Sequence, residues 1–388
     1  MIVLDTETRL RYLRTSIVVA FLGGILFSHK LWFGAGRSFP RSPIASSLPD
    51  TFSLLEFLLS PLLLILLVFI AVRKKPTRFI VVTLTLLALL VFLDQTRLQP
   101  WVYQYSILLG ILAFHGRSPS MTSTTLAACQ LAVAAQYVWS GIQKLNWSFA
   151  HKIVPDILAL TGISLPQSML RLLPLLAIVV ALAEASIGVA LLFRRTRSVG
   201  VIVAVGMHLV LLLVMITSNR NSVIWPWNVA MIVIVGVLFW RAEGYSTRWL
   251  SRASYPLRAM LAIYCLAPVL SFAGWWDLYL SSALYSGNTP NVAVRINEEV
   301  RERLSPETRQ LVFSSKAGEL ILPIYEWSMS DLNVPQYPEV RVYKELGRFV
   351  CRVGGNHPDI ELIIQERPGI VDGAARVIRR SCRDLSQR

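Results

Sequence analysis

Nine long apolar runs, separated by short polar stretches, constrain this chain more than any other feature. Hydrophobic residues make up 54% of the 388 residues and charged residues only 16%. A run of about 20 apolar residues crosses a membrane as a helix, because that conformation pairs every backbone polar group internally. We therefore predict an all-α polytopic membrane bundle of about nine helices, near residues 16–34, 52–72, 78–94, 101–115, 123–144, 172–193, 199–217, 222–240 and 258–276.

The composition changes near Gly287, where we place a domain boundary. Residues 287–388, called the tail below, carry 15 basic and 14 acidic residues, whereas residues 1–286 carry 23 basic and 9 acidic ones. The tail mixes segments typical of strands and of helices, which predicts a small α+β domain. Expected strands are 291–296, 319–325, 340–343 and 360–365, and expected helices are 298–304, 306–312 and 374–383.

One stretch of the tail, residues 325–339, is rich in aromatic residues and proline. Pro335 and Pro338 disfavour a helix there. The stretch is interpreted as an ordered loop with a packed Trp327, in preference to a surface that docks a partner.

Basic residues fall unevenly on the two sides of the apolar runs. The net charge of +15 lies in short loops, as in membrane proteins, which argues against a DNA-binding face and a nucleic-acid partner. Because basic loops stay in the cytoplasm, we predict a cytoplasmic amino terminus and an extracytoplasmic tail. The inner set is then Arg9, Arg11, Arg14, Arg73, Lys74, Lys75, Arg78, Arg117, Arg194, Arg195, Arg197, Arg241, Arg248, Arg252 and Arg258; the smaller outer set is Lys30, Arg37, Arg41, Arg97, Lys144, Lys152, Arg171 and Arg220.

The four cysteines fall into two pairs. Cys129 and Cys265 lie within apolar runs and are interpreted as small core residues. Cys351 and Cys382 lie in the tail, which on the extracytoplasmic side would meet an oxidising compartment. We predict a disulfide between them, with two free thiols as the alternative.

The fifth predicted helix carries a polar stripe. Gln136, Ser140, Gln143 and Lys144 are spaced so that they lie on one helical face. Lys144 lies at the outer end of the helix. Taken alone, it is interpreted as a lysine whose ammonium group reaches the membrane interface.

Two further ionisable residues lie in the middle of apolar runs, where burial makes each one a functional candidate. Glu184 is midway along the sixth run and His208 midway along the seventh. They are predicted either to line a site or to pair with one another in a structural role.

Polar and aromatic residues also gather between the third and fourth runs. Asp94 ends the third run, and Trp101 and Tyr105 follow it. They are interpreted either as part of a site or, for the aromatic residues, as interfacial anchors. The sequence contains no metal-ligand spacing, phosphate-binding loop or nucleophile motif, so no metal site is predicted.

Several of these segments together resemble a known family. The run Tyr137–Trp147, which reads Tyr-Val-Trp-Ser-Gly-Ile-Gln-Lys-Leu-Asn-Trp, resembles the lysine motif of the vitamin K-dependent γ-glutamyl carboxylase family and its bacterial relatives, the HTTM membrane-domain family. The segments Leu93–Tyr105, Glu184–Gly200, His208 and Ile224–Ala230 are similar to other parts of that family.

The resemblance implies a membrane-embedded enzyme, a carboxylase- or epoxidase-like lyase or an oxidoreductase, in the bacterial inner membrane. Lys144 would be the catalytic base, acting on a reduced quinone similar to vitamin K or on another lipid-soluble substrate. The substrate-binding residues would be Gln136, Gln143, Asp94, Trp101, Tyr105, Glu184 and His208.

The chain departs from the carboxylases in two places. Pro100 and Trp101 stand where the carboxylases have an Asn-His pair, and the tail is shorter than their large luminal region. An alternative therefore stays open: a non-catalytic membrane scaffold or subunit that docks a protein partner through its tail. A transporter is less favoured, because no inverted repeat or matching pair of broken helices is present.

Overall fold

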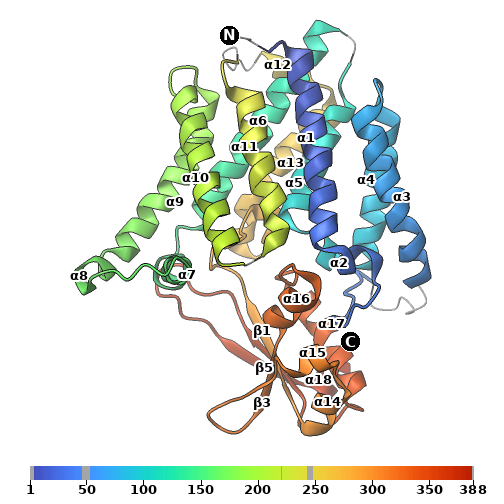
Figure 1. The fold of residues 1–388 in the computed structure, drawn as a ribbon, viewed down its shortest axis with the longest axis vertical. Coiled ribbons are helices and arrows are strands. Elements are labelled where there is room, and N and C mark those ends of the chain that lie inside the picture. Colours follow the sequence, from blue (N-terminus) through green and yellow to red (C-terminus); the bar gives the residue numbers. More distant parts are fainter. Residues whose placement is uncertain (1–3, 46–52, 117, 220, 243–247, 387–388) are drawn as a thin grey trace.

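The computed structural model describes residues 4–45, 53–116, 118–219, 221–242 and 248–386. Phe52, Arg117 and Arg220, which entered the predictions above, lie outside these ranges. A helical bundle forms one end of the molecule and the tail forms the other, with the amino terminus at the end of the bundle far from the tail (Figure 1). The bundle contains α1 (Thr6–Phe27), α2 (His29–Phe33), α3 (Ser53–Val72), α4 (Thr77–Leu93), η2 (Gln95–Arg97), α5 (Pro100–Ala113), α6 (Pro119–Gln143), η3 (Phe149–Ile153), α7 (Val154–Leu160), α8 (Gln167–Leu170), α9 (Leu173–Leu192), α10 (Arg197–Thr217), η4 (Ser222–Ile224), α11 (Trp225–Phe239), α12 (Trp249–Arg252), α13 (Tyr255–Leu266), η5 (Ala267–Ala273) and η6 (Tyr279–Ser281).

Six helical segments among the described residues are long and apolar enough to cross a membrane, so the chain is a multi-pass membrane protein. They are Thr6–Phe27, Leu55–Val72, Leu173–Leu192, Arg197–Thr217, Ser222–Phe239 and Tyr255–Ala273. α4 is apolar but shorter. α5 has only 14 residues. The 25-residue α6 is long enough but is not among the segments that are also sufficiently apolar. Each of the nine predicted segments contains a helix, but the count of nine crossings is not confirmed.

The first helix begins ten residues before its predicted start. Asp5 caps it by accepting a hydrogen bond from the backbone N–H of Thr8 at 2.8 Å, a standard way to satisfy a free N–H group. Arg9 is buried, and its guanidinium donates to the carbonyl oxygens of Val237 and Trp240 at the end of α11. The prediction was wrong because the partners of this arginine lie far away in the sequence.

Two glycines let α6 and α9 pack closely. A Cβ atom at Gly188 would collide with the carbonyl oxygen of Ala134, and one at Gly141 with the backbone nitrogen of Ala185. Small residues allow such close backbone approach between membrane helices. The contact therefore depends on the absence of a side chain at both positions.

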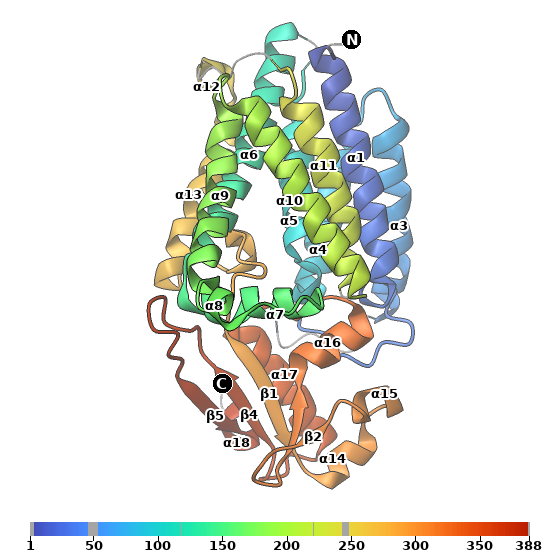
Figure 2. The same cartoon turned by 60° about the vertical axis from the view of Figure 1, so that its left-hand side comes forward.

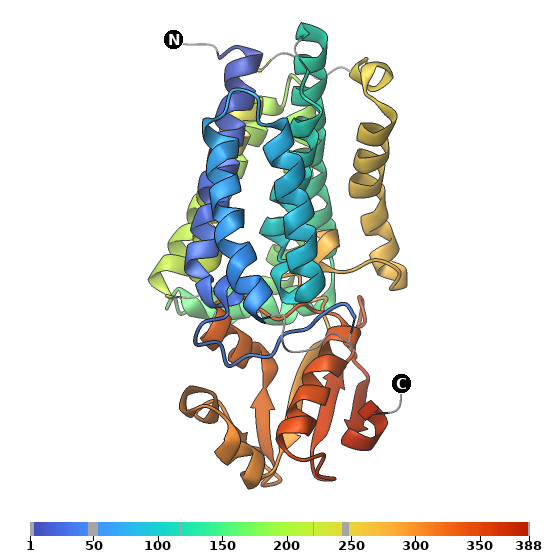
Figure 3. The same cartoon turned by 90° about the vertical axis from the view of Figure 1, so that its right-hand side faces the viewer.

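The tail is a five-stranded antiparallel sheet with strand order β2-β3-β1-β4-β5, covered by helices (Figure 3). In the central strand, Val292, Val294 and Ile296 alternate with more exposed residues and face the core of the tail, as a half-buried strand requires. The elements are β1 (Asn291–Ile296), α14 (Glu298–Arg303), α15 (Pro306–Arg309), β2 (Phe313–Ser314), β3 (Leu320–Pro323), α16 (Ile324–Leu332), α17 (Val340–Val353), β4 (Glu361–Gln365), β5 (Val377–Ser381) and α18 (Cys382–Ser386).

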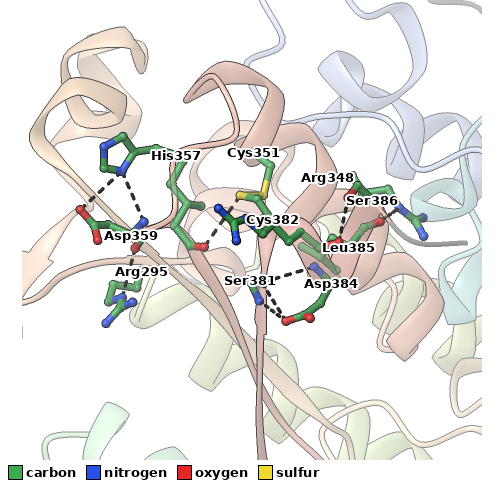
Figure 4. The surroundings of a disulfide bond; sticks show 12 residues. Arg295, Arg348, Cys351, His357, Asp359, Ser381, Cys382, Asp384, Leu385 and Ser386 are labelled. Carbon is green, nitrogen blue, oxygen red and sulfur yellow. Dashed lines mark hydrogen bonds and ion pairs between the residues drawn. A yellow bond between two sulfur atoms is a disulfide. The ribbon is translucent and has the colours of Figure 1, made fainter.

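The predicted disulfide is confirmed. Cys351 of α17 and Cys382 at the start of α18 are bonded (Figure 4). The two cysteines are 31 positions apart in sequence, and the bond ties α18 to α17, the longest helix of the tail. Cys129 and Cys265 are free, and Cys129 is buried.

Three local predictions for the tail were wrong. Residues 340–343 begin α17 instead of forming a strand, because Val342, Leu346 and Val350 make one buried helical face. Residues 377–381 form β5 instead of a helix, by pairing with β4. The first half of 325–339 is helix α16 instead of a loop, since both prolines lie after its end; Trp327 is packed as predicted.

We expect Gly188→Val to destabilise the bundle by about 3 kcal/mol or more, because the new side chain must push α9 away from α6. The matched control is Gly206→Val, since a Cβ at Gly206 on α10 would meet no atom within 4 Å. Thermal unfolding of the two purified variants in detergent measures the difference. Equal melting temperatures would show that the α6–α9 contact is not tight.

Candidate functional site

Lys144 and Glu184 form an ion pair across the α6–α9 contact, in which Glu184 is buried and Lys144 is partly buried. The Lys144 Nζ atom lies 2.9 and 2.7 Å from the two carboxylate oxygens of Glu184 and 2.8 Å from the Ser140 hydroxyl oxygen. The side chains are only 12% and 11% exposed. An ammonium group has three N–H donors, so these oxygens provide an acceptor for each of them. Lys144 turns toward Glu184 instead of extending to the membrane interface.

His208 joins three helices through hydrogen bonds on both ring nitrogens. Its Nε2 atom lies 2.7 Å from the Tyr137 hydroxyl of α6, and its Nδ1 atom lies 2.8 Å from Asn228 Oδ1 of α11. A neutral ring that donates from Nδ1 and accepts at Nε2 satisfies both contacts. Of the two alternatives for these residues, the pairing of Glu184 with His208 is therefore wrong, because each residue has a different partner.

Gln136 and Gln143 link α6 to α13 and η5 by hydrogen bonds. Gln136 accepts a hydrogen bond from the Tyr264 hydroxyl of α13 at 2.6 Å. Gln143 donates to the Ser271 hydroxyl of η5 at 2.8 Å. Both predicted site residues are buried and link neighbouring helices.

The remaining predicted site residues lie at the tail-side ends of α4 and α5. Asp94 accepts from Arg37 at 2.7 Å and is fully buried. Arg97, also fully buried, lies 3.2 Å from Glu56. These charges are paired in the way that burial requires, and they hold the loop after α2 against the bundle.

Trp101 and Tyr105 lie in an aromatic cluster on α5. Both rings contact Phe21 of α1, and Trp101 also contacts Trp32 of α2. Both residues are buried. They therefore act as core residues of the bundle rather than as exposed anchors.

Polar contacts fix the tail to the bundle in a region that we call the junction. Asp331 of α16 accepts from Lys30 at 3.0 Å and from the backbone N–H groups of Ser38 and Phe39, each at 2.7 Å. Gln99 donates to the carbonyl oxygen of Pro335 at 2.9 Å. The three bonds to the Asp331 carboxylate are charge-assisted, and such hydrogen bonds are among the stronger ones.

A second set of contacts holds the β4–β5 loop against the bundle. The backbone N–H of Trp147 donates to the carbonyl oxygen of Ile370 at 2.8 Å. Arg367 donates to the carbonyl oxygen of Ser271 in η5 and lies over the ring of Phe272. The tail is thus attached at both of its sides.

The junction contains a cavity of about 850 Å³, a size typical of ligand sites. One wall comes from η3 and α7, and α7 lies across the tail-side end of the bundle (Figure 2). The other walls come from the loop before η4, from the chain leading to β1, and from α16 and α17. No local pattern in the sequence predicts this cavity, because these segments are far apart along the chain.

Two residues of the polar network were not predicted as site residues. Tyr137 lies seven residues before Lys144, which places both on the same side of α6. Asn228 is an amide within the apolar run of α11. A search for every polar residue in an apolar run would have found both.

Residues 122–226 match the family model described as methylamine utilisation protein MauE. The match covers less than half of the chain and contains Tyr137, Lys144, Glu184 and His208. No curated protein and no solved structure gave a significant match.

This match overturns the resemblance to the HTTM and carboxylase family. The lysine motif 137–147, the segment 184–200 and His208 all lie within the range that matches MauE, and nothing else relates the chain to a carboxylase. The residues of that motif have structural partners here: Gly141 allows the close helix contact, and Lys144 pairs with Glu184.

We expect Lys144→Met to destabilise the protein by about 3–5 kcal/mol, because it leaves the Glu184 carboxylate buried and unpaired. The double variant Lys144→Met/Glu184→Leu should regain most of that loss, since it removes both charges. Thermal unfolding in detergent tests this, with the exposed Lys344→Met as the control. A double variant as unstable as the single one would argue against a simple ion pair.

The junction should also respond to pH through Glu339. Burial raises the pKa of this carboxyl from 4.5 to about 7, against the opposing hydrogen bond from the backbone N–H of Leu278. The proton is therefore bound more tightly in the folded state, so this contribution to stability is present below pH 4.5 and is lost as the pH rises through 7.

Glu339→Gln should make the melting temperature less dependent on pH between 5 and 8, because glutamine resembles the protonated carboxyl. The expected difference in unfolding free energy is at most about 3 kcal/mol. Melting curves of both proteins at several pH values measure it. Parallel pH profiles would mean that Glu339 titrates as an ordinary exposed carboxyl.

Proposed function

We propose that this protein is a non-catalytic membrane scaffold that holds its tail on the extracytoplasmic side and docks a partner protein there, in a system related to methylamine utilisation. Residues 1–286 would form the membrane domain and residues 287–388 the docking domain. The observation that carries the proposal is the engagement of the Lys144 ammonium by Glu184 and Ser140.

A general base needs an open side from which to take a proton from a substrate. The nitrogen of Lys144 has an oxygen acceptor for each of its hydrogens, and its side chain is 12% exposed. His208 is likewise held on both ring nitrogens. The Lys144 ammonium and the His208 ring, the two groups of the bundle best suited to transfer a proton, are thus used to join helices. This favours the scaffold over an enzyme.

The extracytoplasmic placement is supported by charge and by chemistry. The positive-inside rule places the larger set of basic residues in the cytoplasm, and the amino terminus lies on the same side as that set. The tail is at the opposite end of the bundle (Figure 1). The disulfide between Cys351 and Cys382 is typical of an oxidising compartment. In a bacterium, this arrangement corresponds to the inner membrane with the tail in the periplasm.

The matched family is described as a methylamine utilisation protein. That description supports a role in such a system. A scaffold would fulfil such a role by positioning another protein of the system. The tail, which is firmly attached to the bundle, is the part of this chain suited to hold that protein.

The test is growth on methylamine of the source organism with its own copy of the gene deleted. We expect the double variant Lys144→Met/Glu184→Leu to restore growth, because it keeps the fold without the charges. Asp331→Ala should fail to restore it, because the junction loses three hydrogen bonds. Membrane levels of each variant, measured by immunoblot, control for loss of the protein.

A double variant that reaches the membrane at normal levels and still fails to support growth would contradict the proposal, since the ion pair would then have a chemical role. Normal growth with Asp331→Ala would also contradict it.

A further inference from the structure

The junction cavity has two walls whose apolar side chains have room between them. Ile153, Ile157 and Leu160 form a stripe at helical spacing along η3 and α7. Tyr325 and Met329 form a second stripe on α16. Both stripes line the same cavity, so an occupant with apolar groups has two surfaces to contact.

The composition of the lining is that of a protein-recognition surface. Tyrosine, asparagine and proline are the most frequent residue types of the lining, with four of each, and two methionines accompany them. Tyrosine and methionine are enriched at the centres of protein interfaces. The lining residues of these two enriched types are Tyr279, Tyr285, Tyr325, Tyr343, Met215 and Met329.

The charges of the lining do not suit a phospholipid headgroup. Among the described residues, Lys152 is the one basic residue of the cavity wall, and Asp156 and Glu326 accompany it. A phosphate group is bound by clusters of basic side chains or by free backbone N–H groups. The described wall therefore favours an uncharged occupant.

Three buried residues of the wall keep a polar atom without a hydrogen-bond partner among the described residues. They are the hydroxyl of Ser148, the Oδ1 atom of Asn221 and the Oε1 atom of Gln336. All three can accept a hydrogen bond, and the Ser148 hydroxyl can also donate one. A buried acceptor without a partner is unfavourable, and an extended polypeptide carries backbone N–H groups that supply donors at regular intervals.

We propose that the junction cavity binds a short, extended, uncharged segment of a partner polypeptide. The inference rests on the proposed function and specifies how the partner is held. Apolar side chains of the segment lie between α7 and α16, and its backbone hydrogen-bonds to the amide and hydroxyl groups of the wall. A cavity of about 850 Å³ accommodates a few residues of extended chain, not a folded domain.

The first experiment identifies the occupant in living cells. A photo-crosslinking amino acid replaces Met329 inside the cavity or, as the matched control, Phe313, which is exposed on β2 and does not line the cavity. Mass spectrometry of the irradiated, purified protein reads the mass of the adduct. We expect one repeated peptide segment at Met329 and not at Phe313. A lipid adduct alone, or no adduct specific to Met329, overturns the inference.

The second experiment measures binding of a labelled synthetic peptide of the mapped segment to the full-length protein in lipid nanodiscs. Met329→Trp, which fills the cavity, and Tyr325→Ala, which removes an aromatic wall, should each weaken binding at least tenfold. Phe313→Trp should leave the affinity unchanged. Wild-type affinity in both cavity variants overturns the inference.

The two proposals fail in different ways. Growth that depends on Asp331 but a cavity that yields only lipid adducts would leave the scaffold role intact and remove the peptide site. Conversely, a peptide could bind in the cavity while growth depends on the Lys144–Glu184 charges. That result would support the peptide site and remove the non-catalytic scaffold role.

Discussion

The close contact between α6 and α9 is the interaction on which the rest of the bundle depends. Gly141 and Gly188 allow the two backbones to meet, and this closeness brings Lys144 and Glu184 to 2.7 Å. Two charges buried in a membrane are tolerated only when they are paired. Packing and electrostatics are therefore coupled: a side chain at either glycine would also separate the charges. The same helix, α6, carries the bonds to α13 and η5.

The junction extends this arrangement to the tail. Asp331 binds backbone N–H groups of the loop after α2, and that loop is itself held by the buried pair of Arg37 and Asp94. The position of the tail thus depends on charges buried in the bundle. A cavity between two parts that are fixed in this way keeps its shape before anything binds, and a preorganised site loses less free energy on binding.

The sequence predicted the parts of the fold that local patterns determine. Apolar runs located the helices, alternation located β1 and β4, and the tail cysteines gave the disulfide. Contacts between distant residues explain the failures. Arg9 belongs to α1 because its partners are on α11, and β5 is a strand because β4 is beside it. The polar residues of the site were found in the sequence, but their partners and the junction cavity were not.

The polar residues also explain why a short motif in a membrane helix is a poor guide to chemistry. A lysine near a helix end, a glycine one turn before it and a carboxylate on the next helix are what a tight, charged helix pair requires. Here Gly141 precedes Lys144 by three residues, and Glu184 provides the carboxylate. In this chain the three residues have a structural role that requires no reaction. The hydrogen-bond acceptors of the Lys144 ammonium are therefore more informative about function than the motif that contains this lysine.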